Sequence, residues 1–245
     1  MNLIDAEWDE KISGLKTCEI LFEKSDSFKT YLDADIEKNV KFSVVKIPVG
    51  NLKLVHQLED IGYRYLENQM VLSFNVEQLE QINSIWERLF KGFSYKLLTT
   101  REELVSITNQ VSDKMFEADR YSQDPFWTDD LSSRRYVNWI YELFEKSQVR
   151  FYEMIKNGRK VGFFAIKNES EKSNSCPIAG IYNQYKFSGY IFVLVWYILI
   201  ISREMGVNKF VTSISSNNRN LLSSFSKIFH FKVNETFIVL RKTIC

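Results

Sequence analysis

The sequence has few of the residues that break, cross-link or strongly charge a chain. Its 245 residues include three prolines, nine glycines and three cysteines, and the formal net charge is +1. So few prolines and glycines exclude a low-complexity linker. Cys18, Cys176 and Cys245 are far apart and odd in number, which argues against a disulfide framework and offers no metal-ligand spacing. We therefore expect a cytoplasmic protein that holds no metal.

The charge balance and the apolar runs argue against nucleic acid and membranes as partners. With 32 basic and 31 acidic residues, the chain offers no strong field for nucleic acid or an anionic membrane. Residues 1–7 lack the basic region and apolar core of a signal peptide. The apolar run 190–201 spans about 18 Å as a helix, whereas a bilayer needs roughly 20 residues. We interpret this run as a buried core helix rather than a membrane anchor.

The chain does contain enough apolar residues for a core, since 45% are hydrophobic and 15% aromatic. Its first part alternates strand-like and helix-like patterns in a unit of about 75 residues, which is lean for a core of its own. The predicted elements are strands over 15–22, 40–47 and 63–74, helices within 25–38 and over 51–61, and a connecting helix over 77–90. We divide the chain into a small N-terminal α/β domain, 1–92, and a larger domain, 93–245.

The second half also alternates strands and helices. Thr100 and Glu103 resemble a capping box, and Asn157-Gly158 between two apolar runs is typical of a hairpin turn. The predicted strands are 95–98, 149–155, 160–167, 177–182, 210–214 and 231–242, the last as one or two strands, and the predicted helices are 104–116, 131–145, 190–201 and 218–228. This order predicts an α/β or α+β fold around a mixed sheet.

The stretch from Gln184 to Asn218 organises this second half. It has the pattern of a loop, an apolar helix, a glycine stop, a strand and a polar turn. Ser188 is expected to cap the helix N-terminus, and Gly206 to end the helix in a left-handed conformation. Free N–H groups and the positive end of the helix dipole point outward at such an N-terminus, and Gly189 lets a ligand approach the backbone. The pattern is typical of a phosphate site.

Several short motifs occur in an order that resembles a known family. They are Trp8-Asp9 with Gly14, Asp119-Arg120-Tyr121 with Asp124-Pro125, Tyr136-Val137-Asn138-Trp139, Val161-Gly162-Phe163 and Ser215-Ser216-Asn217-Asn218. Residues 95–242 resemble the GNAT acetyltransferase superfamily, and the whole chain resembles its TDP-fucosamine acetyltransferase branch. The resemblance implies a mixed, mostly antiparallel sheet with helices on both faces, a smaller α/β N-terminal half, and acetyl-CoA as the acyl donor.

The resemblance also implies which residues hold acetyl-CoA. Gln184 and Gly189 match the superfamily's pyrophosphate loop, but Phe187 stands where its first glycine is usual. Backbone N–H groups of the loop would bind the pyrophosphate, and the preceding strand would pair with the pantetheine arm. Asn218 either bonds that arm or caps its helix. The implied cofactor residues are Gly180, Ile181, Tyr182, Gln184, Phe187, Ser188, Gly189, Tyr190, Asn218 and Phe225.

The implied reaction is direct acyl transfer. An amine attacks the thioester carbonyl, a backbone N–H near Ile181 polarises that carbonyl, and a general acid protonates the leaving thiolate. Members of the family often place a tyrosine where Phe225 stands, and phenylalanine has no proton to give. The candidate acids are then Ser226, Tyr182 and His230. A packing role for His230 between its phenylalanine neighbours stays open.

The resemblance places acceptor recognition at Arg120, Tyr121 and Asp124, and on the helix that holds Tyr136. An ion pair within the loop and a core position for Tyr136 are also open. The expected acceptor is a small amine, as on a nucleotide-linked amino sugar of surface polysaccharide biosynthesis, with neither nucleic acid nor membrane as a partner; a homodimer is compatible with this. Two alternatives stay open: a catalytically degenerate GNAT-fold binding module, and acylation of a protein or peptide amine.

Overall fold

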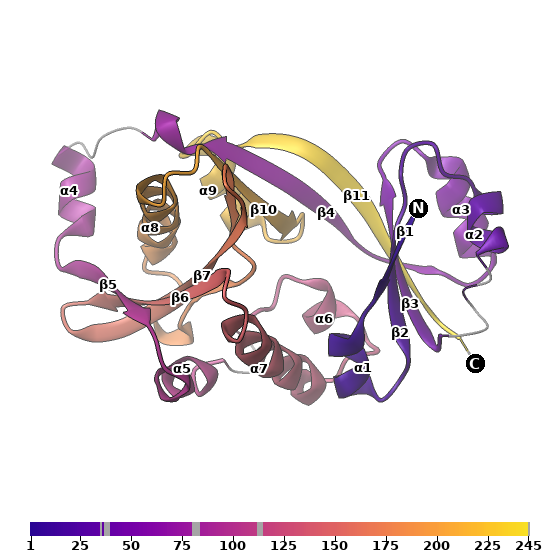
Figure 1. The fold of residues 1–245 in the computed structure, drawn as a ribbon, viewed down its shortest axis with the longest axis horizontal. Helices are drawn as coiled ribbons and strands as arrows, with labels where there is room; N and C mark the ends of the chain where they lie inside the picture. Colours follow the sequence, from indigo (N-terminus) through magenta and orange to yellow (C-terminus); the bar gives the residue numbers. More distant parts are fainter. Residues whose placement is uncertain (35, 37–39, 80–83, 112–114, 245) are drawn as a thin grey trace.

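The computed structural model of the chain describes residues 1–34, 36, 40–79, 84–111 and 115–244. Its strands form one sheet that runs through the molecule, with helices on both faces (Figure 1). The strand order is β1-β2-β3-β11-β4-β10-β8-β7-β6-β5, and the short β9 pairs with β7. Two of the described strand pairs, β2–β3 and β8–β10, are parallel and the others are antiparallel. The predicted mixed, mostly antiparallel α/β fold is confirmed.

The N-terminal half follows its predicted elements closely. These are β1 Asn2–Asp5, α1 Glu7–Ser13, β2 Thr17–Leu21, α2 Phe28–Asp33, β3 Phe42–Pro48, α3 Leu52–Asp60 and β4 Arg64–Asn75. Ser27 caps α2 by accepting the N–H of Thr30, and Asn51 caps α3 by accepting the N–H of Leu54. The strands and helices predicted over 15–74 are confirmed within a few residues, whereas β1 and α1 do not follow from the sequence pattern.

The second half begins after a short 3-10 helix, η2 Val76–Gln78, and α4 Ser84–Phe90. Its elements are β5 Phe93–Leu98, α5 Arg101–Thr108, α6 Arg120–Gln123, α7 Asp129–Phe144, β6 Val149–Lys156, β7 Arg159–Ser170, β8 Ser173–Ser175, β9 Ala179–Ile181, α8 Tyr190–Glu204, β10 Lys209–Ser215, α9 Arg219–Lys227 and β11 Lys232–Thr243. The capping box of Thr100 with Glu103 is confirmed. So is the hairpin turn, in which Asn157 and Gly158 both have positive φ.

Two predicted helices are wrong in extent. The helix predicted over 104–116 ends at Thr108, because the Asn109 that follows favours a turn over a helix interior. Residues 112–114 of that prediction lie outside the described residues. The helix predicted over 77–90 is instead η2 and α4, since Leu79 adopts an extended conformation after Gln78. Residues 80–83 of that prediction lie outside the described residues.

The unit from β3 to β4 is repeated from β10 to β11. Strands β3 and β10 each have seven residues, helices α3 and α9 each have nine, and strands β4 and β11 each have twelve. Asn51 and Asn218 are the N-caps at equivalent positions, and each accepts the N–H three residues on. In both copies the first strand also pairs in parallel with an earlier strand. The chain therefore contains two copies of one strand–helix–strand unit.

The last strand of each copy crosses into the other half. β4 pairs with β10 of the second half, whereas β11 pairs with β3 of the first half. The two also pair with each other, so they lie side by side at the middle of the sheet (Figure 1). The division of the chain at residues 92 and 93 remains a prediction, and the two halves share one sheet across it.

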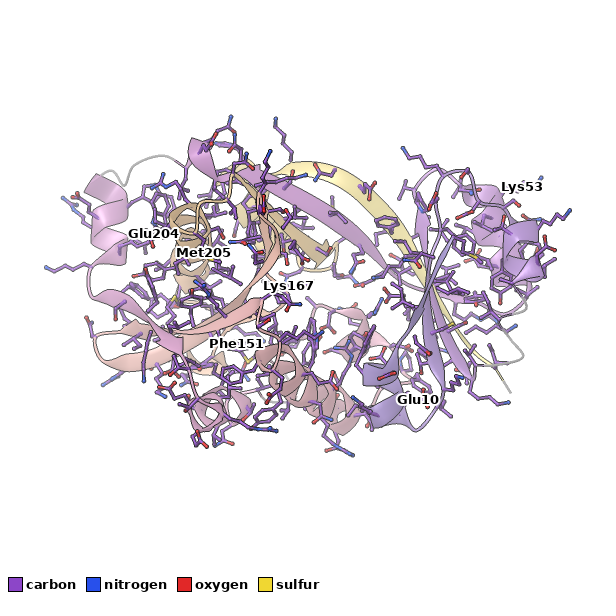
Figure 2. The ribbon with its side chains drawn as sticks, in the orientation of Figure 1. Glu10, Lys53, Phe151, Lys167, Glu204 and Met205 are labelled. Atoms are coloured by element: carbon purple, nitrogen blue, oxygen red, sulfur yellow. The ribbon has the colours of Figure 1, made fainter. Side chains whose placement is uncertain are left out.

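Two apolar clusters cover the faces of the second half of the sheet. Helices α8 and α9 cover one face, where α8 is buried on most sides as expected. Helices α5 and α7 cover the other face, where Phe151, labelled in Figure 2, is completely buried. Alternation along β6 divides the side chains, since Tyr152 and Met154 belong to the first cluster and Phe151 to the second. No helix within the described ranges is both long and apolar enough to cross a membrane.

Candidate active site

Strands β9 and β10 diverge. Residues 209–211 of β10 pair in parallel with β8. The chain then passes through Cys176 and Pro177, and Pro177 has no N–H to continue the ladder. Beyond it, β9 pairs with β7 alone. Residues 212–215 of β10 therefore have no strand partner on this side among the residues described, and the facing edges of β9 and β10 are both free.

The first copy of the repeat does not diverge in this way. Residues 17–21 of β2 pair with residues 42–46 of β3 without a break, and the N–H of Phe22 extends the ladder to the carbonyl of Lys46 at 3.0 Å. Only the second copy, within the described chain, thus leaves backbone hydrogen-bonding groups free between its two parallel strands.

The free edge of β9 presents the N–H of Ile181. On the opposite edge, the N–H of Tyr182 bonds the carbonyl of Val161 at 3.0 Å, and the N–H of Ala165 bonds the carbonyl of Ile178 at 2.9 Å. Successive residues of a strand direct their N–H groups to opposite edges. The N–H of Ile181 therefore points away from β7 and towards β10, where it could meet a carbonyl oxygen placed between the strands.

Glycines allow β9 to lie close on its neighbours. A Cβ at Gly162 would stand 2.6 Å from the carbonyl oxygen of Gly180, which is too close for a side chain. A Cβ at Gly180 would clash with Cε of Met115. Gly162 of the Val161-Gly162-Phe163 motif is thus required by the close packing of β7 on β9. Gly180 places no side chain beside the free edge of β9.

The N-terminus of α8 follows this edge. Gly189 is the N-cap residue, with a φ of 75° that favours glycine. The prediction of Ser188 as N-cap is wrong by one residue: its Oγ donates to the carbonyl of Tyr185 at 2.5 Å and accepts the N–H of Tyr190 at 3.4 Å. The N–H groups of Gly189 and Ile191 have no hydrogen-bond partner in the described part of the chain. They are free to bind an anion.

Side chains do not cover this helix tip. Phe187 is 96% exposed and Gln184 is also exposed. Tyr190 turns aside to pack, since its ring lies edge-on to Phe93 with centroids 4.8 Å apart and stacks on Tyr185 at 5.8 Å. The predicted cofactor residues of the loop therefore leave the backbone at the tip accessible. At the other end of the helix, Gly206 has a φ of 80° and ends α8 as predicted.

Asn218 and Phe225 both have structural roles at α9: Asn218 caps the helix and Phe225 packs in the core. Oδ1 of Asn218 accepts the N–H of Leu221 at 3.2 Å, so the N-cap interpretation holds. Nδ2 of Asn218 makes no hydrogen bond with a described residue and leaves a second role open. Phe225 is buried in the apolar core, with its ring centroid 4.5 Å from that of Phe231. The position where the resemblance led us to look for a tyrosine holds a core residue.

The structure does not gather the three candidate acids. Ser226 is exposed on α9, where its Oγ reaches only a carbonyl of its own helix. His230 is exposed after α9 with a φ of 53°. It lines a surface hollow of about 330 Å³ together with Lys209 and Lys232. Lys209 is the first residue of β10, so this hollow lies at the N-terminal end of the strand, whereas the free edge is at residues 212–215 near its C-terminal end. We therefore place no part of the reaction in the hollow.

Tyr182 follows Ile181 and is completely buried on the α5 and α7 face. Its Oη has no hydrogen-bond partner within the described residues. Burial, and then the nearby negative charge of Glu153, raise the pKa of Tyr182 far above its ordinary value. Glu153 is itself held by Ser106 at 2.8 Å and Lys160 at 2.9 Å. Tyr182 therefore keeps its proton throughout the physiological pH range.

Two of the predicted acceptor residues, Arg120 and Tyr121, belong to a buried ionic network. Nη2 of Arg120 donates to Oε2 of Glu19 and to Oη of Tyr121, both at 2.8 Å. Tyr121 donates to Asp9 at 3.2 Å and accepts Nη2 of Arg135 at 2.7 Å. Burial raises the pKa of Tyr121 to about 12. Nη1 of Arg120 and Nη1 of Arg135 are buried without a partner in the described chain.

The other two predicted acceptor residues are also engaged within the protein. Asp124 accepts Nε and Nη2 of Arg241 at 3.0 and 2.8 Å, which ties its loop to β11. Tyr136 is buried in the core between α7 and the sheet, with its ring centroid 4.3 Å from that of Phe116. The core interpretation therefore holds for Tyr136, whereas the ion pair expected within the loop is wrong, because Asp124 pairs with Arg241 of β11 and Arg120 with Glu19 of β2. An acceptor role for these residues stays a prediction.

Comparison with known proteins bears on this geometry. No family model matches the sequence, and no curated protein does. A solved GCN5-related N-acetyltransferase from Sphaerobacter thermophilus matches with a TM-score of 0.67 and 12% identity, over 99% of this chain and 76% of that one. A tandem GNAT protein from the clavulanic acid biosynthesis pathway, without AcCoA, matches with a TM-score of 0.57 and 9% identity, over 94% and 75%.

The chain has the GNAT fold. A GCN5-related N-acetyltransferase from Kribbella flavida also matches, with a TM-score of 0.54 and 12% identity over 92% of this chain and 80% of that one. Identities this low show the shared fold and nothing of the substrate. The resemblance to the TDP-fucosamine acetyltransferase branch of the GNAT superfamily stays a prediction from the sequence.

Proposed function

We propose that this GNAT-fold chain transfers an acyl group from acetyl-CoA to a small amine. The observation that carries the proposal is the divergence of β9 from β10, which frees the N–H of Ile181 beside the uncovered N-terminus of α8. A free strand edge and a helix N-terminus are the two features that a ligand with amide groups and a diphosphate needs.

The residues around the divergence fit acetyl-CoA. The N–H groups of Gly189 and Ile191, with the positive end of α8, suit its pyrophosphate. The edge of β9 suits the amides of the pantetheine arm, and Gly180 places no side chain there. Nδ2 of Asn218 is a further donor for that arm. When bound, acetyl-CoA supplies the acyl thioester that the amine attacks.

The chain's own part in the reaction is to orient and polarise. The N–H of Ile181 donates to the thioester carbonyl oxygen and stabilises the negative charge that develops there. Tyr182, which keeps its proton and follows Ile181, is the acid that we retain from the sequence prediction. Ser226 and His230 lie on exposed surfaces elsewhere, and we give them no part in the reaction.

The acceptor that we propose is the amino group of a nucleotide-linked amino sugar, as in surface polysaccharide biosynthesis. The sequence resemblance is the main support. The two buried guanidinium nitrogens without a partner, on Arg120 and Arg135, add support because such donors suit the phosphates of a nucleotide.

A thiol-release assay tests this proposal. The protein is mixed with acetyl-CoA and, in separate reactions, with a nucleotide-linked amino sugar, a free amino sugar and a lysine peptide. We expect release of free CoA to be fastest with the nucleotide-linked amino sugar. Binding of acetyl-CoA without release in any reaction would indicate the degenerate binding module, and a preference for the peptide would indicate protein acylation.

A further inference from the structure

Glu67 on β4 is a buried carboxylate that no described group satisfies. It is 3% exposed, its Oε2 has no hydrogen-bond partner, and it takes part in no ion pair with a described residue. A buried charge left without a partner is strongly unfavourable. Each such group in a native structure needs an explanation, and an absent ligand is one.

Side-chain alternation places Glu67 on the face of the sheet that carries α6. Met70, Leu72 and Phe74 of β4 pack into the core below α8 and α9, so the odd-numbered side chains of the strand point the other way. Asp119, the N-cap of α6, lies on this side. Burial raises the pKa of Asp119 to about 6, and the charge of Glu67 contributes to the rise.

Lys46, whose charge interacts with Glu67, and Arg120 of α6 are both held by another carboxylate. Nζ of Lys46 lies 2.6 Å from Oε1 of Glu19, and Nη2 of Arg120 lies 2.8 Å from Oε2 of Glu19. Neither comes within ion-pair distance of Glu67. Glu67 therefore keeps an oxygen free for a positively charged group that arrives from outside the protein.

The register of β4 brings Glu67 near the turn that follows β10. Gln69, its neighbour on the same face, pairs with Ser215, and the N–H of Ser216 bonds the carbonyl of Asn68 at 2.8 Å. Gln69 is half-buried and Ser213 of β10 is exposed on this face. Ser213, Gln69 and Glu67 therefore share one face of the sheet, next to the strand β10 whose other edge faces Ile181.

Given the proposed acyl transfer, on which this inference rests, we propose that Glu67 binds the ammonium group of the acceptor and takes the proton that its nitrogen must lose before attack. A primary amine arrives protonated near neutral pH. The ammonium donates to Oε2 of Glu67, and one proton passes to the carboxylate. The freed lone pair forms the carbon–nitrogen bond as the carbon–sulfur bond breaks. Tyr182 protonates the leaving sulfur and is itself reprotonated by the second proton that the nitrogen sheds, and Glu67 returns its own proton to water.

Glu67→Gln tests the inference without any substrate. The substitution keeps the shape of the side chain and removes an unpaired charge, so the unfolding temperature should rise by about 2–4 °C. Glu19→Gln is the matched control, because it breaks two ion pairs on the same face and should lower that temperature. A fall for Glu67→Gln like that for Glu19→Gln would show an internal structural charge and overturn the inference.

A small ammonium probe tests the binding itself. Methylammonium chloride should raise the unfolding temperature of the wild-type protein more than the same concentration of tetramethylammonium chloride, which has no N–H to donate. Glu67→Gln should abolish that difference. An equal response of the wild type to the two salts, or a difference that survives in Glu67→Gln, would overturn the inference.

Turnover measurements distinguish an error in the role proposed for Glu67 from an error in the proposed acyl transfer. In the thiol-release assay, Glu67→Gln should lower kcat/KM for the amine by about 100-fold or more, as expected for loss of a general base, and leave the Kd of acetyl-CoA unchanged. Unchanged turnover would overturn the role of Glu67 alone. A wild-type protein that binds methylammonium but not acetyl-CoA would contradict the acyl transfer, and with it the acceptor role.

Discussion

Nε of Arg135 on α7 lies 2.7 Å from Oδ1 of Asp9 on α1, and both side chains are buried. The contact joins the N-terminal helix to the face of the second half that carries α6 and α7 (Figure 1). Tyr121 bridges the pair, since it contacts both residues through its hydroxyl group. The face that we assign to the acceptor is therefore built from both halves of the chain.

Removing the guanidinium group of Arg135 should destabilise the protein strongly. Arg135→Met leaves Asp9 buried without its ion-pair partner, and such a loss costs about 3–5 kcal/mol of the free energy of unfolding. Urea unfolding of the two proteins measures it. Arg134→Met is the control, because Arg134 is adjacent but exposed and pairs with Asp130 at 3.6 Å. That change should stay within about 0.5 kcal/mol; equal losses at both positions would contradict a special role for the buried pair.

The stability contributed by Glu19 should depend on pH. Burial alone would raise the pKa of Glu19, but Arg120 and Lys46 outweigh it and lower the pKa from 4.5 to about 2. A carboxylate whose pKa is lower in the folded than in the unfolded state stabilises the fold at pH values above its unfolded pKa. This stabilisation is lost as the pH falls through its folded pKa. Glu19→Gln should cost about 3 kcal/mol at pH 7, and the cost should shrink between pH 4.5 and 2. Urea unfolding at a series of pH values checks it; a cost that does not change with pH would refute the assignment.

Local patterns in the sequence predicted most of the helices and strands. The apolar run of α8, the capping box at Thr100 and the turn at Asn157 are decided by neighbours in the chain, so period and cap rules find them. The pairing of β4 with β10, and of β11 with β3, could not be predicted. Each strand has an apolar pattern that fits several neighbours, and the choice depends on contacts between distant residues.

The candidate site was predictable only in part. The sequence located the helix tip at Gly189 and the strand end at Ile181, because turns and glycines mark both. It did not reveal that Arg120 and Asp124 are engaged by Glu19 and Arg241, since partners in other elements carry no local signal. Glu67 gave a weak signal that could have been followed: a carboxylate in the middle of a predicted strand, which is costly to bury unless paired.

The two copies of the repeat provide a matched pair of cap variants. Asn51→Ala and Asn218→Ala each remove a side-chain N-cap and should each cost about 1 kcal/mol of stability. Only Asn218→Ala should also weaken acetyl-CoA binding, because only the second copy has divergent strands. Calorimetric titration of the two variants checks this. Equal affinities in the two variants would mean that Asn218 serves the fold alone.

The exposed ring of Phe187 leaves the backbone at the helix tip accessible, so its removal should hardly change phosphate binding. Phe187→Ala removes a side chain that is 96% exposed, so the stability should change by less than about 0.5 kcal/mol. We expect the Kd of acetyl-CoA to change by less than about threefold, because the ring does not cover the backbone N–H groups. Val49→Ala, an exposed apolar residue of the first copy, is the control. Weaker binding in Phe187→Ala would show instead that the ring contacts the ligand.

Amide hydrogen exchange with and without acetyl-CoA tests the central claim most directly. The claim is that the ligand pairs with the free edge of β9 and with the N-terminus of α8. We predict slower exchange in residues 179–191 when acetyl-CoA is added, and unchanged exchange in residues 17–28 of the first copy, where the strands do not diverge. Exchange that is unaltered in residues 179–191, or slowed equally in both segments, would contradict the account.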